Sequence, residues 1–431
     1  MQVAHVERHL QRFMRSEVLR DVIKRNRAGQ AMSIPSVCSA QGDAILASLL
    51  RAQTLDCTIV IEATSNHVNQ FGGYTGMRSS DFMAFVYGIA KIANVDLERI
   101  QFGGDYLGPQ VWRNESPDSA MAKVHQLVSN YVQAGFTKIH LDCSEGCASE
   151  PAQLDDEITT ARSAKLARIC LNSANNLMFI VGTEVPPPGG ARTNKSGDIA
   201  ATSPDTAHAT FALHMDKFGD IAALICGLVV QQGVEFSPMQ IHHLSMAKDP
   251  ELIQSITDWP FVCLEAHSVD YQHPHVLQRL AQLGFAFQKV GPALALAYLQ
   301  ALYSLNIVRS FLLRCERHLP VALEIAMLEN LQYWRIFYYG SAEQLLQLRH
   351  FGLADRIRYY WPVPSVQAAV QQLFDDLPHQ IPDPILWQIF GQPVLDCEED
   401  LAGSQVQRLV RAQIQIVLDL YFFDPKKRGA Q

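Results

Sequence analysis

The stretch that decides the fold is IPSVCSAQGDAILASLLRAQTLDCTIVIEATS (34–65). Its two ends contain the short apolar runs Ile34–Cys38 and Thr58–Ala63, which are typical of strands that are covered on both faces. Between them, Asp43–Gln53 has the periodicity of an amphipathic helix. A strand, a helix and a second buried strand in this order indicate a unit of a parallel sheet.

The same alternation continues along the chain to residue 315. The further strands that we expect are Ile100–Gly104, Lys138–Leu141, Met178–Thr183, Leu224–Val230, Phe261–Ala266 and Phe285–Val290. The further helices that we expect are Asp81–Asn94, Ser119–Ala134, Glu157–Ser173, Asp205–Phe218, His275–Leu283 and Ala293–Cys315, with at least one more between Phe236 and Thr257. Eight strands that alternate with helices predict an α/β fold, a TIM (β/α)8 barrel. A doubly wound open sheet is the rival, but no GxGxxG motif follows the first strand.

The barrel leaves two flanking segments. Residues 1–32 are expected to form an N-terminal helical segment, residues 33–315 the barrel, and residues 316–431 a helical C-terminal extension packed on the barrel. The extension is rich in proline and has no strand–helix alternation. The N-terminus is amphipathic and lacks the apolar core of a signal peptide, so we expect a cytoplasmic protein.

Composition excludes several classes of protein. The 431 residues are 48% hydrophobic and 18% charged, which excludes a largely disordered chain. The net charge of −8 argues against sequence-independent nucleic-acid binding. The apolar stretch Ile221–Val230 is too short to span a bilayer, so no membrane partner is expected. Nine scattered cysteines argue against a disulfide framework, and Cys143 with Cys147 lacks the partners of a zinc site.

In a barrel enzyme, the residues that carry out the chemistry lie at the carboxyl ends of the strands. Asp105, in GGDYLGP, is a candidate general base, with a turn-forming residue as the alternative. Glu184 and His267 are candidate catalytic residues and metal ligands, with a buried salt bridge and a core histidine as the alternatives. Phosphate is expected beside Ser268, Lys289 and Gly291, in the loops after strands seven and eight. The other candidate substrate-binding residues at strand ends are Ser39, Glu62, Ser65, Asp142 and Gln231.

Eight segments of the sequence carry a resemblance to a known family. They are IEATSNHVNQFGGYTGM (61–77), FGGDYLGP (102–109), GFTKIHLD (135–142), VGTEVPPPGG (181–190), VVQQGVEF (229–236), EAHSVDYQ (265–272), KVGPAL (289–294) and ADRIRYYWP (354–362). In order and in register from Ser36 to Pro362, they resemble the accessory subunit family of class II D-tagatose-1,6-bisphosphate aldolase, which includes ketohexose-6-phosphate 4-epimerases. The residues after Pro362 match poorly.

The resemblance implies a TIM barrel that acts on ketohexose phosphates. A 4-epimerase of this family would interconvert tagatose 6-phosphate and fructose 6-phosphate by retro-aldol cleavage of C3–C4 and re-addition. The resemblance also implies a divalent metal (Zn, Mn, Mg or Ni) that acts as a Lewis acid. It implies Asp105 as the residue that moves the proton of the C4 hydroxyl.

The sequence departs from the family pattern at one position. The family usually has Asp-His in its third segment, whereas this chain has Asp105-Tyr106. Gln231 stands where the catalytic aldolases have a histidine, but this is usual in the accessory family. Glu184 and His267 remain as the expected metal ligands. This departure leaves open a weaker, oxygen-rich metal site or a metal-free site.

Three functions follow from these observations. The first is a 4-epimerase or aldolase component that acts on a sugar phosphate. The second is a non-catalytic subunit that stabilises a catalytic class II aldolase partner. The third is a 4-epimerase of unphosphorylated tagatose and fructose. A homo-oligomer is also expected.

Overall fold

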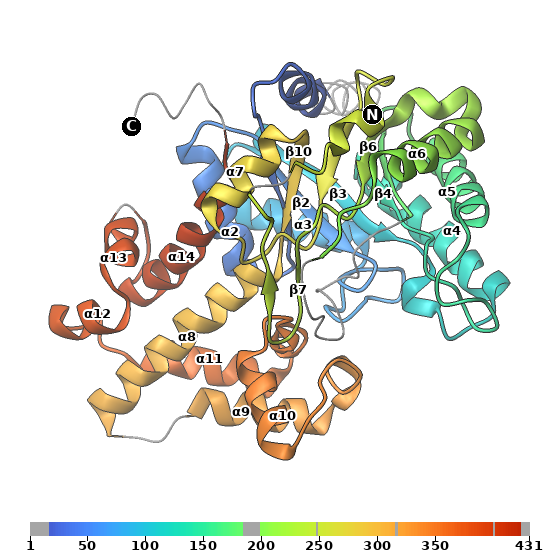
Figure 1. Cartoon of the computed structure of the whole chain (residues 1–431). Coiled ribbons are helices and arrows are strands. Elements are labelled where there is room, and N and C mark those ends of the chain that lie inside the picture. Colours follow the sequence, from blue (N-terminus) through green and yellow to red (C-terminus); the bar gives the residue numbers. More distant parts are fainter. Residues whose placement is uncertain (1–16, 184–198, 247–248, 315–317, 400, 424–431) are drawn as a thin grey trace, which may run out of the picture.

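The computed structural model of the chain describes residues 17–183, 199–246, 249–314, 318–399 and 401–423. Its centre is a closed barrel of eight parallel strands in the order β1-β10-β9-β6-β5-β4-β3-β2 (Figure 1). The strands are β1 Ile34–Cys38, β2 Ile59–Thr64, β3 Ile100–Leu107, β4 Lys138–Leu141, β5 Met178–Val181, β6 Ile225–Val229, β9 Cys263–Ala266 and β10 Phe285–Val290. Strand β1 closes the barrel by pairing with β10 on one side and β2 on the other. The predicted barrel is confirmed, and an open sheet is excluded.

Helices cover the outside of the barrel, as expected from their amphipathic periodicity. They are α2 Gly42–Thr54, α3 Ser79–Ile92, α4 Pro117–Ala134, α5 Asp156–Leu171, α6 Pro204–Phe218, α7 Pro274–Gln282 and α8 Pro292–Leu313. Several begin at side-chain caps: Ser116 accepts the Ser119 N–H and Ser203 accepts the Thr206 N–H. Helix α4 ends at Gly135, whose φ of 120° suits glycine.

The prediction of at least one α-helix between Phe236 and Thr257 is wrong for the described residues there. They form a two-stranded antiparallel hairpin, β7 Glu235–Phe236 and β8 Ile241–His242, and a five-residue 3-10 helix, η4 Leu252–Ile256. The weak periodicity of this segment corresponds to short turns and to the 3-10 helix η4, which packs against α6.

A helix over residues 17–27 closes one end of the barrel. Its Leu19, Val22 and Ile23 share a buried apolar cluster with Ile34 and Met178, the first residues of β1 and β5. The helix therefore seals the amino ends of the strands. The carboxyl ends lie at the opposite mouth.

The C-terminal extension is helical. It contains α9 His318–Glu329, η5 Leu331–Tyr333, α10 Ala342–Phe351, η6 Arg356–Tyr360, α11 Pro364–Asp376, α12 Asp383–Ile389, α13 Gln392–Glu398, α14 Gln405–Leu418 and η7 Asp419–Tyr421. Helix α14 packs against α8 and α2, where the Gln415 amide donates to the Ala47 carbonyl at 2.9 Å. Ser33 and Phe423 exchange backbone hydrogen bonds of 3.1 and 3.3 Å, which join the end of the extension to the start of the barrel. The limits that we predicted between segments stay predictions.

Helix α8 is the one described helix that is long and apolar enough to cross a membrane by length and composition. Half of its most apolar window is buried inside the protein, where it packs against α14 and α11. A core helix of a globular fold has the same properties. The apolar character of α8 is therefore accounted for by its contacts within the protein.

Candidate active site

The interior of the barrel is unusually rich in charge near its carboxyl end. Successive side chains of a strand alternate between its two faces. In β4, Lys138 and His140 both point into the barrel, while Ile139 and Leu141 belong to the apolar cluster that the strands share with the helices. The six buried ionisable residues that meet there are Glu62, Asp105, Lys138, His140, Glu265 and Lys289.

Two lysines and two glutamates form a buried ion network. The Lys138 ammonium lies 2.6 Å from Glu62 Oε1 and 2.6 Å from Glu265 Oε2. The Lys289 ammonium lies 3.1 Å from Glu62 Oε2 and 3.5 Å from Glu265 Oε1. Burial alone would raise the pKa of Glu265, but the two lysines outweigh it and hold that pKa below its usual range. Both glutamates are thus held as partners of lysine beneath the mouth of the barrel.

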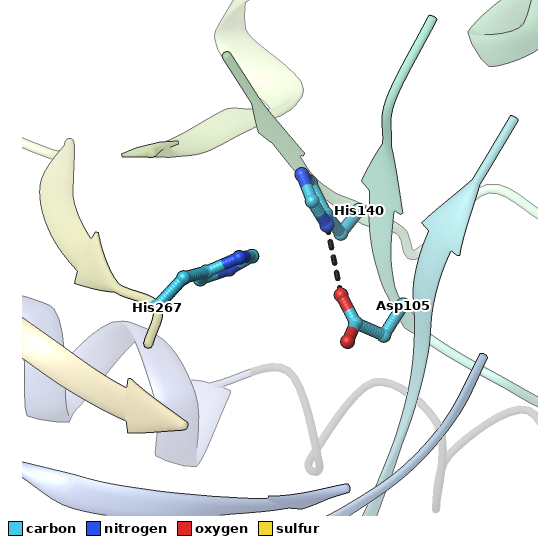
Figure 2. A group of neighbouring side chains, drawn as sticks. All are labelled: Asp105, His140 and His267. Carbon is cyan, nitrogen blue, oxygen red and sulfur yellow. Dashed lines mark hydrogen bonds and ion pairs between the residues drawn. The ribbon is translucent and has the colours of Figure 1, made fainter. Parts of the chain in front are cut away.

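Above this network, Asp105, His140 and His267 converge from β3, β4 and the loop after β9 (Figure 2). One potential ligand atom from each lies within 4.8 Å of the others. The Asp105 Oδ1 is 2.8 Å from His140 Nδ1, and the Lys289 ammonium also contacts this oxygen. Burial would raise the pKa of Asp105, but Lys289 and His140 hold it well below its usual value, so the carboxylate is ionised.

The His267 imidazole is held in a defined orientation. Its Nε2 is 3.0 Å from Glu265 Oε1, and its Nδ1 is 2.9 Å from the Tyr106 hydroxyl. Burial, reinforced by Lys289, lowers the pKa of His267 to about 3, so the ring is neutral. The ionised Glu265 accepts the Nε2 proton, which leaves the Nδ1 lone pair as the acceptor for Tyr106. A carboxylate behind a neutral imidazole is the arrangement that orients metal-ligating histidines.

The residues of this cluster fit a divalent metal. His140 Nδ1 lies 2.8 Å from Asp105 Oδ1, and the hydrogen bond between them helps to keep the carboxylate ionised. The buried Nε2 of His140 also has no hydrogen-bond partner among the described residues. Two imidazoles and a carboxylate suit Zn, Mn or Ni better than Mg, which prefers oxygen ligands.

Two cavities adjoin the cluster. The mouth cavity is lined by Asp105, Tyr106, His267, Ser268 and Lys289, together with Cys38, His67, Gly291 and Arg358. The side cavity, of about 340 Å³, lies between the barrel loops and α11 and shares Cys38, His67, Gly291 and Arg358 with the mouth cavity. Together they offer an entry to Asp105 and His267 from the surface.

The structure brings only some of the predicted site residues to these cavities. Asp105, His267, Ser268, Lys289 and Gly291 line the mouth cavity, and Ser39 lines the side cavity. Glu62 lies below, in the ion network. Glu184 lies outside the described residues.

Three other predicted substrate-binding residues make contacts within the protein. The Ser65 hydroxyl donates to the Tyr106 carbonyl at 3.2 Å. Asp142 accepts from Gln110 Nε2 at 2.6 Å and from the Ser144 backbone N–H at 3.0 Å. Gln231 Oε1 accepts the Gly233 N–H at 2.8 Å. These contacts give each of the three a local structural role, and their binding to substrate stays a prediction.

The expected phosphate position holds an internal anion. The Asp270 carboxylate accepts the backbone N–H groups of Gly291 and Ala293, at 3.0 and 2.8 Å, at the start of α8. Burial raises the pKa of Asp270 to about 6, although these two hydrogen bonds oppose the shift. Because the Gly291 N–H and the Lys289 ammonium already bind carboxylates, these contacts do not favour their predicted roles toward phosphate.

Sequence reasoning missed His140 and Lys138. The signal was present in KIHLD (138–142), where polar residues alternate with apolar ones in a strand that is otherwise buried. Such alternation in a barrel strand marks side chains that point into the barrel. The strand-end rule selects Asp142, which directly follows β4, and so passes over the inward-facing Lys138 and His140.

Known proteins resemble this chain over nearly its whole length. A D-tagatose 6-phosphate 4-epimerase of Agrobacterium fabrum is 38% identical over 94% of this chain and 97% of its own length. A D-tagatose-1,6-bisphosphate aldolase subunit GatZ of Salmonella paratyphi B is 37% identical over 94% and 98%. A crystal structure described as a probable tagatose 6 phosphate kinase from Sinorhizobium meliloti superposes with a TM-score of 0.83 at 38% identity, covering 90% of this chain and 99% of that one. A family model matches residues 19–424, and the chain therefore belongs to the D-tagatose-1,6-bisphosphate aldolase subunit GatZ/KbaZ-like family.

Proposed function

We propose that this protein is a ketohexose-phosphate 4-epimerase that interconverts tagatose 6-phosphate and fructose 6-phosphate. The observation that carries the proposal is the convergence of Asp105, His140 and His267 near the carboxyl end of the barrel, where Asp105 and His267 line the mouth cavity. The name of the Agrobacterium fabrum relative, which aligns over nearly the whole chain, supports the substrate class.

The reaction inverts C4 of the ketose by breaking and remaking the C3–C4 bond. In the first step the C4 hydroxyl loses its proton, C3–C4 breaks, and C4 becomes the carbonyl carbon of a three-carbon aldehyde. In the second step the other fragment attacks the opposite face of that carbonyl, and the new C4 oxygen takes the proton back. One group that accepts and returns a proton therefore serves both directions.

Asp105 is the residue to which we assign this proton transfer. Its carboxylate is ionised, so it can accept a proton at neutral pH. The two oxygens have different surroundings: Oδ1 faces His140 and Lys289, whereas Oδ2 is 3.5 Å from the Cys38 thiol. In this assignment Oδ2 faces the C4 hydroxyl, while Oδ1 stays with His140 and Lys289.

His140 and His267 are the residues that would hold a divalent metal, with Asp105 Oδ1 beside them. The metal supplies Lewis-acid stabilisation of the negative charge that develops on the ketone fragment. Glu265 keeps His267 in the required tautomer by accepting its Nε2 proton. The predicted contribution of Glu184 to the metal site stays part of this proposal.

The test is to incubate the purified protein alone with fructose 6-phosphate and to measure tagatose 6-phosphate. The protein is first treated with a chelator, and Mn²⁺, Zn²⁺, Ni²⁺ or Mg²⁺ is then added back separately. Metal-dependent formation of tagatose 6-phosphate that is lost in Asp105→Asn supports the proposal. No product with any of these metals would overturn it.

A second candidate function is the non-catalytic subunit of a class II aldolase, as the name of the Salmonella relative suggests. The position of Tyr106 favours this second function. Its hydroxyl is hydrogen-bonded to Nδ1 of His267, whose lone pair must be free if this histidine is to bind a metal in a catalytic site. A pull-down of a catalytic class II aldolase subunit, together with an inactive purified chain, would support this function instead.

A further inference from the structure

The mouth cavity is lined by two cationic side chains, Lys289 and Arg358. Lys289 is surrounded by the carboxylates of Glu62, Asp105 and Glu265, which neutralise it. Arg358 hydrogen-bonds the Tyr359 side chain and interacts with the Asp355 carboxylate at longer range, but it forms no ion pair among the residues that the structure describes. The buried Nε of its guanidinium also lacks a hydrogen-bond partner in that part of the chain. Arg358 is therefore the lining cation whose charge is available to a ligand.

Arg358 reaches the barrel from outside it. It belongs to η6 of the C-terminal extension, within the segment ADRIRYYWP (354–362). Its side chain lines both the mouth cavity, with Asp105 and His267, and the side cavity, with Ser39 and Gln41. The extension thus brings a positive charge to the cavity that contains the candidate catalytic residues.

An aromatic frame fixes this part of η6. The ring of Tyr359 stacks on Tyr333, with 4.9 Å between centroids and 11° between planes. Tyr74, from the loop after β2, contacts both rings, with its centroid 4.6 Å from that of Tyr359 and 6.5 Å from that of Tyr333. The backbone that carries Arg358 is consequently held between the extension and a barrel loop, which reduces the entropy lost when the guanidinium binds a ligand.

The usual phosphate position of a barrel is already filled in this protein. The N–H groups at the start of α8 bind the Asp270 carboxylate, an internal anion in the place where a ligand phosphate would otherwise lie. A phosphate in the mouth cavity consequently needs another positive partner. A planar guanidinium matches two phosphate oxygens with two parallel N–H donors.

We propose that Arg358 binds the phosphate group of a ketohexose phosphate in the mouth cavity, and so selects phosphorylated over free sugars. This inference rests on the proposed function for its substrate class. Arg358 is here a substrate-binding residue contributed by the extension, and no chemical step is assigned to it.

The test measures binding, so that its result does not depend on turnover. Calorimetry with fructose 6-phosphate, free fructose and inorganic phosphate is applied to the wild type, Arg358→Gln and Arg358→Lys. We expect Arg358→Gln to weaken fructose 6-phosphate binding about 10- to 100-fold, the scale of lost charged hydrogen bonds. Binding of inorganic phosphate should weaken in parallel, and free fructose should bind the wild type and the variant equally. Arg358→Lys should retain part of the affinity because it keeps the charge.

The control is Arg335→Gln, which removes an exposed arginine of the same extension that lines neither cavity. Its affinities should match those of the wild type. Equal loss of fructose and fructose 6-phosphate binding in Arg358→Gln would overturn the inference, as would unchanged fructose 6-phosphate binding or a wild type that does not bind this sugar phosphate. If Arg358→Gln fails to fold, Arg358→Lys decides by the same comparison. A wild type that binds fructose 6-phosphate through Arg358 but never epimerises it would refute the proposed function and leave this inference intact.

Discussion

The Tyr106 hydroxyl lies 2.9 Å from Nδ1 of His267, the nitrogen that is not protonated in the neutral ring. Tyr106 also has a left-handed backbone, with φ of 48°, and so departs from the extended conformation of the rest of β3. This irregular backbone directs the aromatic ring across the mouth of the barrel. The residue that departs from the family pattern thus occupies the lone pair that a metal would use.

Replacing Tyr106 with histidine should tighten zinc binding, because the substitution removes the competing hydroxyl and adds an imidazole. Calorimetric titration with Zn²⁺ measures the effect. Tyr106→Phe is the matched control, since it removes the hydroxyl and adds no ligand. If both variants bind Zn²⁺ as the wild type does, the hydroxyl does not limit the metal site.

Replacing Asp105 with asparagine should lower epimerisation by ~10²–10⁴-fold, the usual contribution of a general base. The asparagine keeps the size of the side chain but cannot accept the C4 proton. Turnover and the thermal midpoint are measured on the same preparation, with the exposed Asp96→Asn as control. Undiminished turnover would remove Asp105 from the mechanism. A collapsed midpoint would show that its main role is to neutralise Lys289.

Replacing His140 with glutamine should weaken binding of Mn²⁺ and Zn²⁺ by more than ~10-fold, since even outer partners of metal sites have effects of this size. The imidazole is a better ligand for these ions than an amide. The exposed His379→Gln is the control for loss of a surface histidine. Equal metal affinity in the two variants would exclude His140 as a ligand.

Replacing Lys138 with methionine should destabilise the protein by about 3–5 kcal/mol, the usual cost of breaking a buried ion pair. Both Glu62 and Glu265 would lose a partner 2.6 Å away in the interior. The control is Lys123→Met, which breaks the solvent-exposed pair with Glu115 and should destabilise the protein far less. The free energy of unfolding in urea distinguishes the two. A small effect at Lys138 would mean that water or a proton replaces the lysine.

The Asp270→Asn substitution should change how stability depends on pH. The folded-state pKa of Asp270 is raised from 3.8 to about 6, so the folded protein binds this proton more tightly than the unfolded chain. The contribution of this group to stability is full below the unfolded value and is lost as the pH rises to about 6. The loss is roughly 3 kcal/mol at about 1.4 kcal/mol per unit.

Asparagine carries no titrating proton, and its side-chain oxygen can still accept the Gly291 and Ala293 N–H groups. The stability of Asp270→Asn relative to wild type should therefore increase between pH 4 and pH 7. Denaturant titrations at several pH values, with the exposed Asp220→Asn as control, measure the difference. A relative stability that does not vary with pH would show that Asp270 titrates normally.

The sequence predicted the barrel because periodicity is a local property that each strand and helix carries on its own. It also identified Asp105 and His267, since strand ends in a barrel meet at one mouth. The partners of these residues were harder to predict. Nothing in the chain near Lys289 shows that it binds three carboxylates from other strands, and nothing near Gly291 shows that Asp270 occupies its N–H. Pairings of this kind depend on how side chains from distant segments fill one space.

Arg358 illustrates the same limit. Its segment was part of the family resemblance, but its place in the proposed helical extension gave no reason to associate it with the barrel mouth. The mutual packing of Tyr359, Tyr333 and Tyr74, which joins η6 to a barrel loop, cannot be read from the sequence.

The backbone bridge between Ser33 and Phe423 also has a consequence for biosynthesis. A ribosome releases the chain from its N-terminus, so Ser33 emerges long before its partner exists. Until translation is complete, the backbone of Ser33 lacks this partner, and helix α14 is not yet in place to cover α2 and α8. Premature termination before α14 leaves the surfaces of α2 and α8 that this helix covers exposed, and such products should aggregate in cells or be degraded even when every candidate active-site residue has been made.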